Sequence, residues 1–175
     1  MNDYRAFFAL LEELGIASET VEHEAVFTAE ALAGRDAAQW EFPVKNILVE
    51  DKTKQLYLIT MHLRTPPLDL KHLATRALAT GRFSFASPQT LADTLKVQPG
   101  SVTPFAVFND RARKVRVVLD ARMRTAKTVS AHPLINTMTT TIAVKDLLRL
   151  LALTGHEPLW IEMPLRAEKN AGLTL

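Results

Sequence analysis

Two apolar runs separated by a short polar stretch constrain the fold of this chain more than any other feature. Residues 44–49 and 55–61 are rich in Val, Ile and Leu, and they flank the polar residues 51–54. Apolar runs of this length around such a stretch are typical of a β-hairpin with a loop of four to five residues. The runs 102–108 and 115–119 predict a second hairpin in the same way. The chain is therefore expected to build a sheet with antiparallel pairs.

Helical patterns are interspersed with these strands. Apolar residues at helical spacing over residues 3–14, closed by Gly15, predict an amphipathic helix. The other expected helices cover 29–34, 70–80, 89–95 and 145–153, and the other expected strands cover 21–25, 82–86, 139–142 and 159–163. Because helices and strands do not alternate regularly, the pattern favours an α+β fold with a mixed sheet over a doubly wound one.

Length and composition exclude several classes of protein. The 175 residues fit one domain, expected over 1–165 with a tail at 166–175, and they lack cysteine. Disulfides, thiolate nucleophiles and cysteine-ligated zinc are thereby excluded, and the scattered glycines match neither a Walker loop nor a dinucleotide fingerprint. We expect no cofactor and no metal. No secretory signal or run of about 20 apolar residues is evident, so we expect a soluble cytoplasmic protein.

The net charge of +2 does not by itself indicate nucleic acid, but charge is uneven along the chain. Residues 111–127 contain seven Lys and Arg against the single acid Asp120. Such a segment either follows a phosphate backbone or forms the solvated face of a strand and its turns. The glutamates of the N-terminal part would then face away from RNA.

Three short segments are candidates for chemistry. The first, residues 100–105, opens with Gly100 and continues to Pro104, and a loop shaped by these residues can direct backbone N–H groups at an anion. The second is Lys45-Asn46 at the head of a predicted strand, where a lone lysine more often covers the edge of the core. The third is 132–136, where the turn-prone His132-Pro133 pair suggests an imidazole held on an ordered loop.

The order and spacing of these segments resemble the YbaK-type aminoacyl-tRNA deacylases. The closest branch is that of the free-standing prolyl-tRNA editing proteins, PrdX or ProXp-ala, which hydrolyse alanine wrongly attached to proline tRNA. The resemblance rests on seven segments in family order, namely 23–28, 45–49, 81–88, 100–105, 108–110, 132–137 and 155–158. It implies a curved mixed sheet flanked by helices around one pocket, and a substrate that is the acceptor end of a mischarged tRNA.

The resemblance also implies roles for individual residues. Lys45 would meet the phosphate or ribose at the end of the tRNA, with Asn46 and Arg82 as further contacts. Backbone N–H groups around Gly100, Ser101 and Val102 would stabilise the oxyanion, while His132 would shape the pocket. A serine nucleophile at position 101 is disfavoured because the sequence offers no nucleophile elbow or partner set. The expected pocket residues are Phe27, Thr28, Phe105, Leu134, Ile135 and Asn136, with core packing an equal alternative for the apolar ones.

Four places depart from the family pattern. Glu24-Ala25 replaces a common Pro-Pro pair, and Val44 replaces a frequent cysteine. Glu50 stands where a basic residue is common and would repel phosphate. Ala106 stands where glycine is common and would narrow or stiffen the pocket loop. The amino acid removed from the tRNA could therefore be alanine, serine or another small one.

We therefore expect a trans-editing hydrolase acting on Ala-tRNA(Pro). The alternatives are a deacylase of Ser-, Cys- or Thr-tRNA, and a non-catalytic module that binds tRNA or a synthetase. Prolyl-tRNA synthetase is a second candidate partner.

Overall fold

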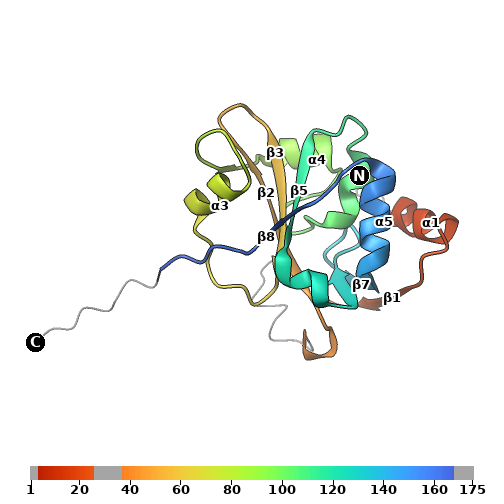
Figure 1. The fold of residues 1–175 in the computed structure, drawn as a ribbon. Helices are drawn as coiled ribbons and strands as arrows, with labels where there is room; N and C mark the ends of the chain where they lie inside the picture. Colours follow the sequence, from red (N-terminus) through yellow and green to blue (C-terminus); the bar gives the residue numbers. More distant parts are fainter. Residues whose placement is uncertain (1–3, 26–36, 168–175) are drawn as a thin grey trace, which may run out of the picture.

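A five-stranded mixed sheet forms the centre of the computed structural model, which describes residues 4–25 and 37–167 (Figure 1). Its strand order is β4-β2-β3-β5-β8. The bounds are Ser84–Phe85 for β4, Val44–Glu50 for β2, Leu56–His62 for β3, Val115–Asp120 for β5 and Leu159–Ile161 for β8. Strand β2 pairs antiparallel with β3 and β4, whereas β5 pairs parallel with β3 and β8. The predicted mixed sheet and α+β class are confirmed.

The predicted first hairpin is present as β2 and β3, and Asp51 organises its turn. The Asp51 carboxylate accepts hydrogen bonds from Thr53 N at 2.8 Å, Gln55 N at 3.1 Å and Thr80 N at 2.9 Å. Asp51 is only 4% exposed. Burial raises the pKa of this carboxyl, but the hydrogen bonds outweigh burial and lower its pKa to about 2.

Replacing Asp51 by alanine is expected to destabilise the fold by about 2 kcal/mol at pH 7, because buried donors lose their acceptor. The folded-state pKa of about 2 lies below the ordinary value of 3.8 for an aspartate. The contribution is therefore fully present above about pH 4 and is lost as the pH falls toward 2. Chemical denaturation at pH 7 and pH 3 measures this, with the exposed Asp93→Ala as control. An equal deficit for Asp51→Ala at both pH values would contradict the assignment.

The predicted second hairpin is wrong. Residues Pro104–Asn109 form a 3₁₀ helix, η2, because Thr103 Oγ1 accepts a hydrogen bond from Phe105 N at 3.3 Å and Pro104 occupies the first helical turn. Asp110 Oδ2 then accepts a hydrogen bond from Val115 N at 2.8 Å as the chain enters β5. The apolar run 104–107 is buried as helix rather than as strand.

A second sheet of three antiparallel strands has the order β1-β7-β6. Its strands are Ser18–Glu22, Met138–Ala143 and Thr128–Ala131, respectively. The first of these begins three residues before the predicted strand 21–25, and β6 was not predicted. A parallel bridge between Pro43 and Ser130 joins the two sheets, with Ser130 N donating to Phe42 O at 3.1 Å. Two adjoining sheets therefore replace the single curved sheet that was expected.

The helices lie on both faces of the five-stranded sheet, with α3 on one side and α1 and α5 on the other (Figure 1). Their bounds are Tyr4–Glu13 for α1, Leu70–Arg76 for α3, Pro88–Thr94 for α4 and Val144–Thr154 for α5, with short 3₁₀ helices at Ala37–Gln39 (η1) and Ala121–Thr125 (η3). The Ser87 cap on α4 and the left-handed Gly155 after α5 are as predicted. The helix expected over 29–34 lies outside the described residues.

Three predicted elements are shorter than expected. Helix α3 ends at Arg76 because Leu78 adopts a left-handed φ of 55°. The strands expected at 82–86 and 159–163 reduce to β4 and β8.

Among the described residues, no helix is long and apolar enough to cross a bilayer. The domain boundary at 165 stays a prediction, and residues 168–175 lie outside the description.

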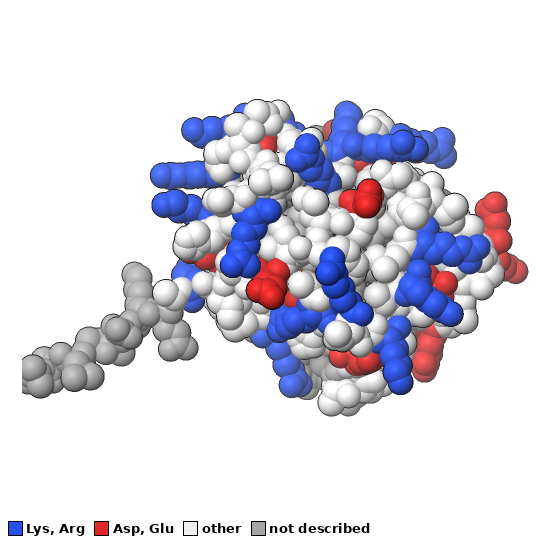
Figure 2. Space-filling model, in the orientation of Figure 1, with Lys and Arg blue, Asp and Glu red and all other residues white. Residues whose placement is uncertain are grey.

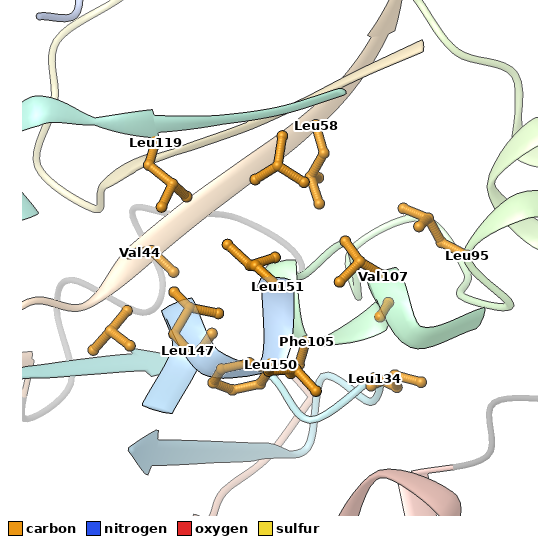
Figure 3. Close-up of a cluster of buried hydrophobic side chains, with 14 of the residues drawn as sticks. Val44, Leu58, Leu95, Phe105, Val107, Leu119, Leu134, Leu147, Leu150 and Leu151 are labelled. Carbon is orange, nitrogen blue, oxygen red and sulfur yellow. The ribbon is translucent and has the colours of Figure 1, made fainter. Parts of the chain in front are cut away.

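Two hydrophobic clusters flank the five-stranded sheet. The larger contains Val44 and Leu48 of β2 together with residues of α1, α5 and η2 (Figure 3). The smaller contains Val49 and is covered by Leu73 of α3. Since side chains alternate along a strand, Asn46 faces the larger cluster and Lys45 the opposite side.

Candidate functional site

The start of β2 is the place where the three predicted segments meet. The parallel bridge between Pro43 and Ser130 sets the end of β6 beside the start of β2. Lys45 lies two residues after Pro43, and His132 lies two residues after Ser130. Because the bridge is parallel, the two segments run from it in the same direction. Of the expected tRNA contacts, Lys45 and Asn46 therefore share this junction with the His132 loop.

Asn46 joins β2 to the Gly100 loop. Its Nδ2 donates a hydrogen bond to Val102 O at 3.1 Å. Its Oδ1 is buried and has no hydrogen-bond partner within the described part of the chain, and the same holds for Oγ1 of Thr60, which pairs with Asn46 across β2 and β3. Two buried oxygens without hydrogen-bond partners lower the stability of the folded protein. They offer acceptor or hydroxyl groups beside the loop, for a water or a substrate donor.

The Gly100 loop is shaped as predicted, but one of its N–H groups is engaged. Gly100 has a φ of 85°, which favours glycine. Ser101 N donates to Gln98 O at 3.0 Å, so this group does not point to an oxyanion. The Ser101 side chain is 3% exposed. Of the three expected donors, the N–H groups of Gly100 and Val102 remain candidates.

His132 is a partly buried, oriented imidazole. Its Nδ1 lies 2.7 Å from Met138 O, and since a carbonyl only accepts, Nδ1 carries the hydrogen. The other nitrogen, Nε2, is thereby an acceptor in the neutral ring. Burial lowers the pKa of His132 and outweighs the opposing effect of the hydrogen bond to Met138 O, and the nearby His23, whose ring centroid lies 5.8 Å away, lowers it further. His132 is therefore neutral at physiological pH and suited to accept a hydrogen bond.

His23 is held by two contacts. Its Nδ1 donates to Glu24 O at 2.8 Å, and its Nε2 lies 2.9 Å from the Thr139 hydroxyl. With Nδ1 carrying the hydrogen in the neutral ring, Nε2 accepts from that hydroxyl. The two histidines thus lie side by side at the junction of β1 and β7 with the His132 loop.

The expected pocket residues are distributed between core and loop. Phe105 and Leu134 are fully buried among the core side chains around α5 (Figure 3), and Phe105 stacks on Phe7 with ring centroids 4.8 Å apart. Core packing, the alternative raised for both, is thus the arrangement observed. Leu134 has a φ of 68°, a strained value for a leucine that gives the His132 loop a sharp bend. Ile135 and Asn136 are partly buried, and Phe27 and Thr28 lie outside the described residues.

Arg82 is not brought to the start of β2. It lies just before β4, which pairs with Val49 and Glu50 at the opposite end of that strand. Glu50 itself is paired with Lys54, whose Nζ lies 2.6 Å from Glu50 Oε1, so its expected repulsion of phosphate is offset. Arg82 is exposed, and its expected contact with tRNA stays a prediction.

Three of the seven basic residues in the segment 111–127, namely Arg116, Arg122 and Arg124, have aromatic or acidic partners within the protein. The Arg116 guanidinium lies 5.8 Å from the centre of the Tyr57 ring, and that of Arg124 lies 4.9 Å from the centre of the Trp160 ring. Figure 2 shows Lys and Arg side chains spread over this face, with acidic side chains among them and along the edge where α1 lies. These contacts favour the solvated-face alternative over a phosphate track.

The sequence reasoning missed the residues that hold Lys45. Lys45 Nζ donates to Thr65 O at 2.5 Å, and Thr65 Oγ1 accepts from Arg122 Nη2 at 2.6 Å. Arg122 in turn binds the fully buried carboxylate of Asp120. The hydrogen bonds of Arg122 outweigh burial and lower the pKa of Asp120. The only signal in the sequence was a lone acid within a basic segment.

Comparison with known proteins identifies the family of this chain. Residues 23–150 match the model of the aminoacyl-tRNA editing domain. The prolyl-tRNA editing protein ProX of Acetoanaerobium sticklandii is 33% identical over 157 residues, 89% of this chain and 94% of that protein. The prolyl-tRNA synthetase associated domain-containing protein 1 of Danio rerio is 33% identical over 150 residues, 85% of this chain and 80% of that protein.

Among solved structures, a candidate trans-editing enzyme for prolyl-tRNA synthetase superposes with a TM-score of 0.69. The match covers 93% of this chain and 97% of that one, at 21% identity, and it supports the fold. The family model spans all three segments that converge at the start of β2. The chain belongs to the aminoacyl-tRNA editing domain family.

Proposed function

We propose that this protein is a trans-editing hydrolase that removes alanine from mischarged tRNA(Pro). The observation that carries the proposal is the convergence of Lys45-Asn46, the Gly100 loop and His132 at the start of β2. Relatives named for prolyl-tRNA editing support the tRNA substrate, and those named for association with prolyl-tRNA synthetase support that enzyme as a second partner.

The reaction is hydrolysis of the ester between the amino acid and the terminal ribose. A water attacks the carbonyl carbon, the carbonyl oxygen becomes an oxyanion, and the ribose oxygen leaves with a proton. Lys45 anchors the acceptor end by its charge, while the N–H groups of Gly100 and Val102 stabilise the oxyanion. His132 accepts a hydrogen bond at Nε2 and so orders the substrate or the water. The family resemblance implies that a ribose hydroxyl assists the water.

A covalent serine intermediate is disfavoured by the geometry. The Ser101 side chain is almost fully buried. Within the described part of the chain, its hydroxyl has no histidine partner, and the rings of His132 and His23 bond elsewhere. A positioned water is therefore the proposed nucleophile, which suits an activated ester.

Selection by size is the proposed basis of specificity. Since Phe105 and Leu134 are committed to the core, the candidate walls that remain in the described residues are Ile135 and Asn136. A site that admits alanine and excludes proline supplies discrimination that binding at a synthetase cannot, because small apolar differences are worth only about 10- to 200-fold.

A panel of tRNAs carrying alanine, serine, cysteine, threonine or proline tests this proposal with the wild-type protein. We expect the fastest deacylation for alanine and at least about 100-fold slower loss of proline. Faster deacylation of the tRNA that carries serine, cysteine or threonine would show that this amino acid, and not alanine, is the substrate. Binding of every tRNA with no turnover would overturn the enzyme in favour of a non-catalytic binding module.

A further inference from the structure

A buried carboxylate at the end of β5 begins a chain of hydrogen bonds that leads to Lys45. Asp120 is 0% exposed, and its oxygens accept from Arg122 Nε at 3.0 and 3.1 Å and from Arg122 Nη2 at 2.5 Å. It also caps η3 by accepting from Arg122 N at 3.0 Å. A buried charge requires such pairing, and contacts to both oxygens fix the plane of the guanidinium.

Arg122 extends this order to the loop after β3. Its Nη2 donates to Thr65 Oγ1 at 2.6 Å, and Thr65 is only 2% exposed. Thr65 N donates to His62 O at 2.9 Å, and Pro66 follows, which restricts the backbone of Thr65. Thr65 thus accepts from Arg122 through its side-chain hydroxyl and from Lys45 of β2 through its backbone carbonyl.

The Thr65 carbonyl is the acceptor that holds the Lys45 ammonium, at 2.5 Å. A lysine side chain is flexible, and without a fixed acceptor its charge would occupy many positions. The bond to Thr65 therefore sets where the positive charge lies. Four residues, from Asp120 to Lys45, form one continuous network across β5, η3, the loop after β3 and β2.

The charges that surround His62 are mainly positive. Burial lowers the pKa of His62, and the charges of Arg122, Arg64 and Lys45 lower it further, against the opposing effect of Asp120. Three cations thus act on one imidazole with a single carboxylate among them. The network concentrates positive charge beside Lys45, where a polyanionic substrate would arrive.

We propose that Asp120, Arg122 and Thr65 are positioning residues that hold the Lys45 ammonium in place for the acceptor end of the tRNA. This inference rests on the proposed function of the site. The three residues act through Lys45 and do not touch the reacting atoms.

A double-mutant cycle on kcat/KM for Ala-tRNA(Pro) tests the proposal, with Lys45→Ala, Arg122→Ala and the double variant. We expect Arg122→Ala to cost on the order of 10-fold in the wild-type background, since small misplacements of a binding group are costly, and under about 2-fold once Lys45 is absent. An undiminished effect in the Lys45→Ala background would overturn the proposal and assign Arg122 a contact of its own.

Arg122→Lys separates geometry from charge. Lysine keeps the charge but cannot bond Asp120 and Thr65 as a planar fork does, so we expect no rescue. Full activity of Arg122→Lys would overturn the proposal, because charge alone would then suffice.

A matched pair of buried carboxylates controls for stability. Asp110 is also buried, with Oδ2 3.2 Å from His156 Nε2 and 2.8 Å from Val115 N. Asp120→Asn and Asp110→Asn are both expected to lower the denaturation midpoint. Only Asp120→Asn should lower kcat/KM at a temperature where both are folded, and equal losses would overturn the positioning role.

A cycle on unfolding keeps this inference separable from the proposed function. In urea denaturation, the midpoint shifts of Lys45→Ala and Arg122→Ala should be non-additive in the double variant. Non-additive shifts without turnover on any aminoacyl-tRNA would support the linkage and overturn the proposed function. Additive shifts would overturn the linkage whether or not the protein hydrolyses the substrate.

Discussion

Replacement of Lys45 by alanine is expected to lower kcat/KM for Ala-tRNA(Pro) by about 100-fold or more. The ammonium is held by Thr65 O, and Lys45 lies at the start of β2 next to Asn46, whose side chain bonds the Gly100 loop. Its loss removes the compact charge that anchors the phosphate or ribose next to the ester. Because anchoring places the carbonyl at the oxyanion donors, we expect kcat to fall as well as KM to rise.

Matched controls isolate the Lys45 effect from net charge. Lys145→Ala removes the same charge from an exposed position on α5 and should leave kcat/KM within about 2-fold of wild type, since exposed charges far from a site have small effects. The dependence of binding on salt should weaken for Lys45→Ala by about one phosphate contact. Equal activity of Lys45→Ala and Lys145→Ala would contradict the assigned role.

Replacement of Gly100 by alanine is expected to lower kcat by about 10- to 100-fold, the range for a displaced oxyanion donor. The φ of 85° at Gly100 is unfavourable for any residue with a Cβ, so the loop would relax. Relaxation moves Val102, whose carbonyl accepts from Asn46 Nδ2 at 3.1 Å. The donors would then no longer lie where the oxyanion develops.

Gly15→Ala provides the matched control. Gly15 also has a positive φ, 63°, and a Cβ built there meets nothing within 4 Å. Both variants should lose roughly 1–2 kcal/mol of stability, the usual cost of a left-handed alanine. Gly15 lies after α1, away from the start of β2, so activity should survive there. Loss of activity in both variants, or in neither, would contradict a special role for the Gly100 loop.

Local patterns predicted those elements whose stabilising contacts are close in sequence. The β2–β3 hairpin and α1 follow from short-range periodicity, and α4 and α5 also follow from their caps, Ser87 and Gly155. The prediction of the second hairpin was wrong because the apolar run between Thr103 and Asn109 is compatible with a buried 3₁₀ helix as well as with a strand. The short strand β6 has little apolar periodicity. It forms because it pairs with β7, a contact that its own sequence does not reveal.

The site was predicted in part, for the same physical reason. Loop chemistry and the family resemblance indicated Lys45, the Gly100 loop and His132, and the Pro43–Ser130 bridge is what brings two of them together. Arg82 was placed with them by motif order, but β4 pairs at the far end of β2. The Asp120 network could not be read from the sequence, because Arg122 and Thr65 lie 57 positions apart.

The most direct test of the central claim compares the initial rates at which catalytic amounts of the wild-type protein deacylate Ala-tRNA(Pro) and Pro-tRNA(Pro). We predict multiple turnovers on the alanine ester, with proline lost no faster than in buffer alone. Hydrolysis of both esters at similar rates would contradict selection by size, and stable Ala-tRNA(Pro) in the presence of the protein would contradict alanine editing at the Lys45 site.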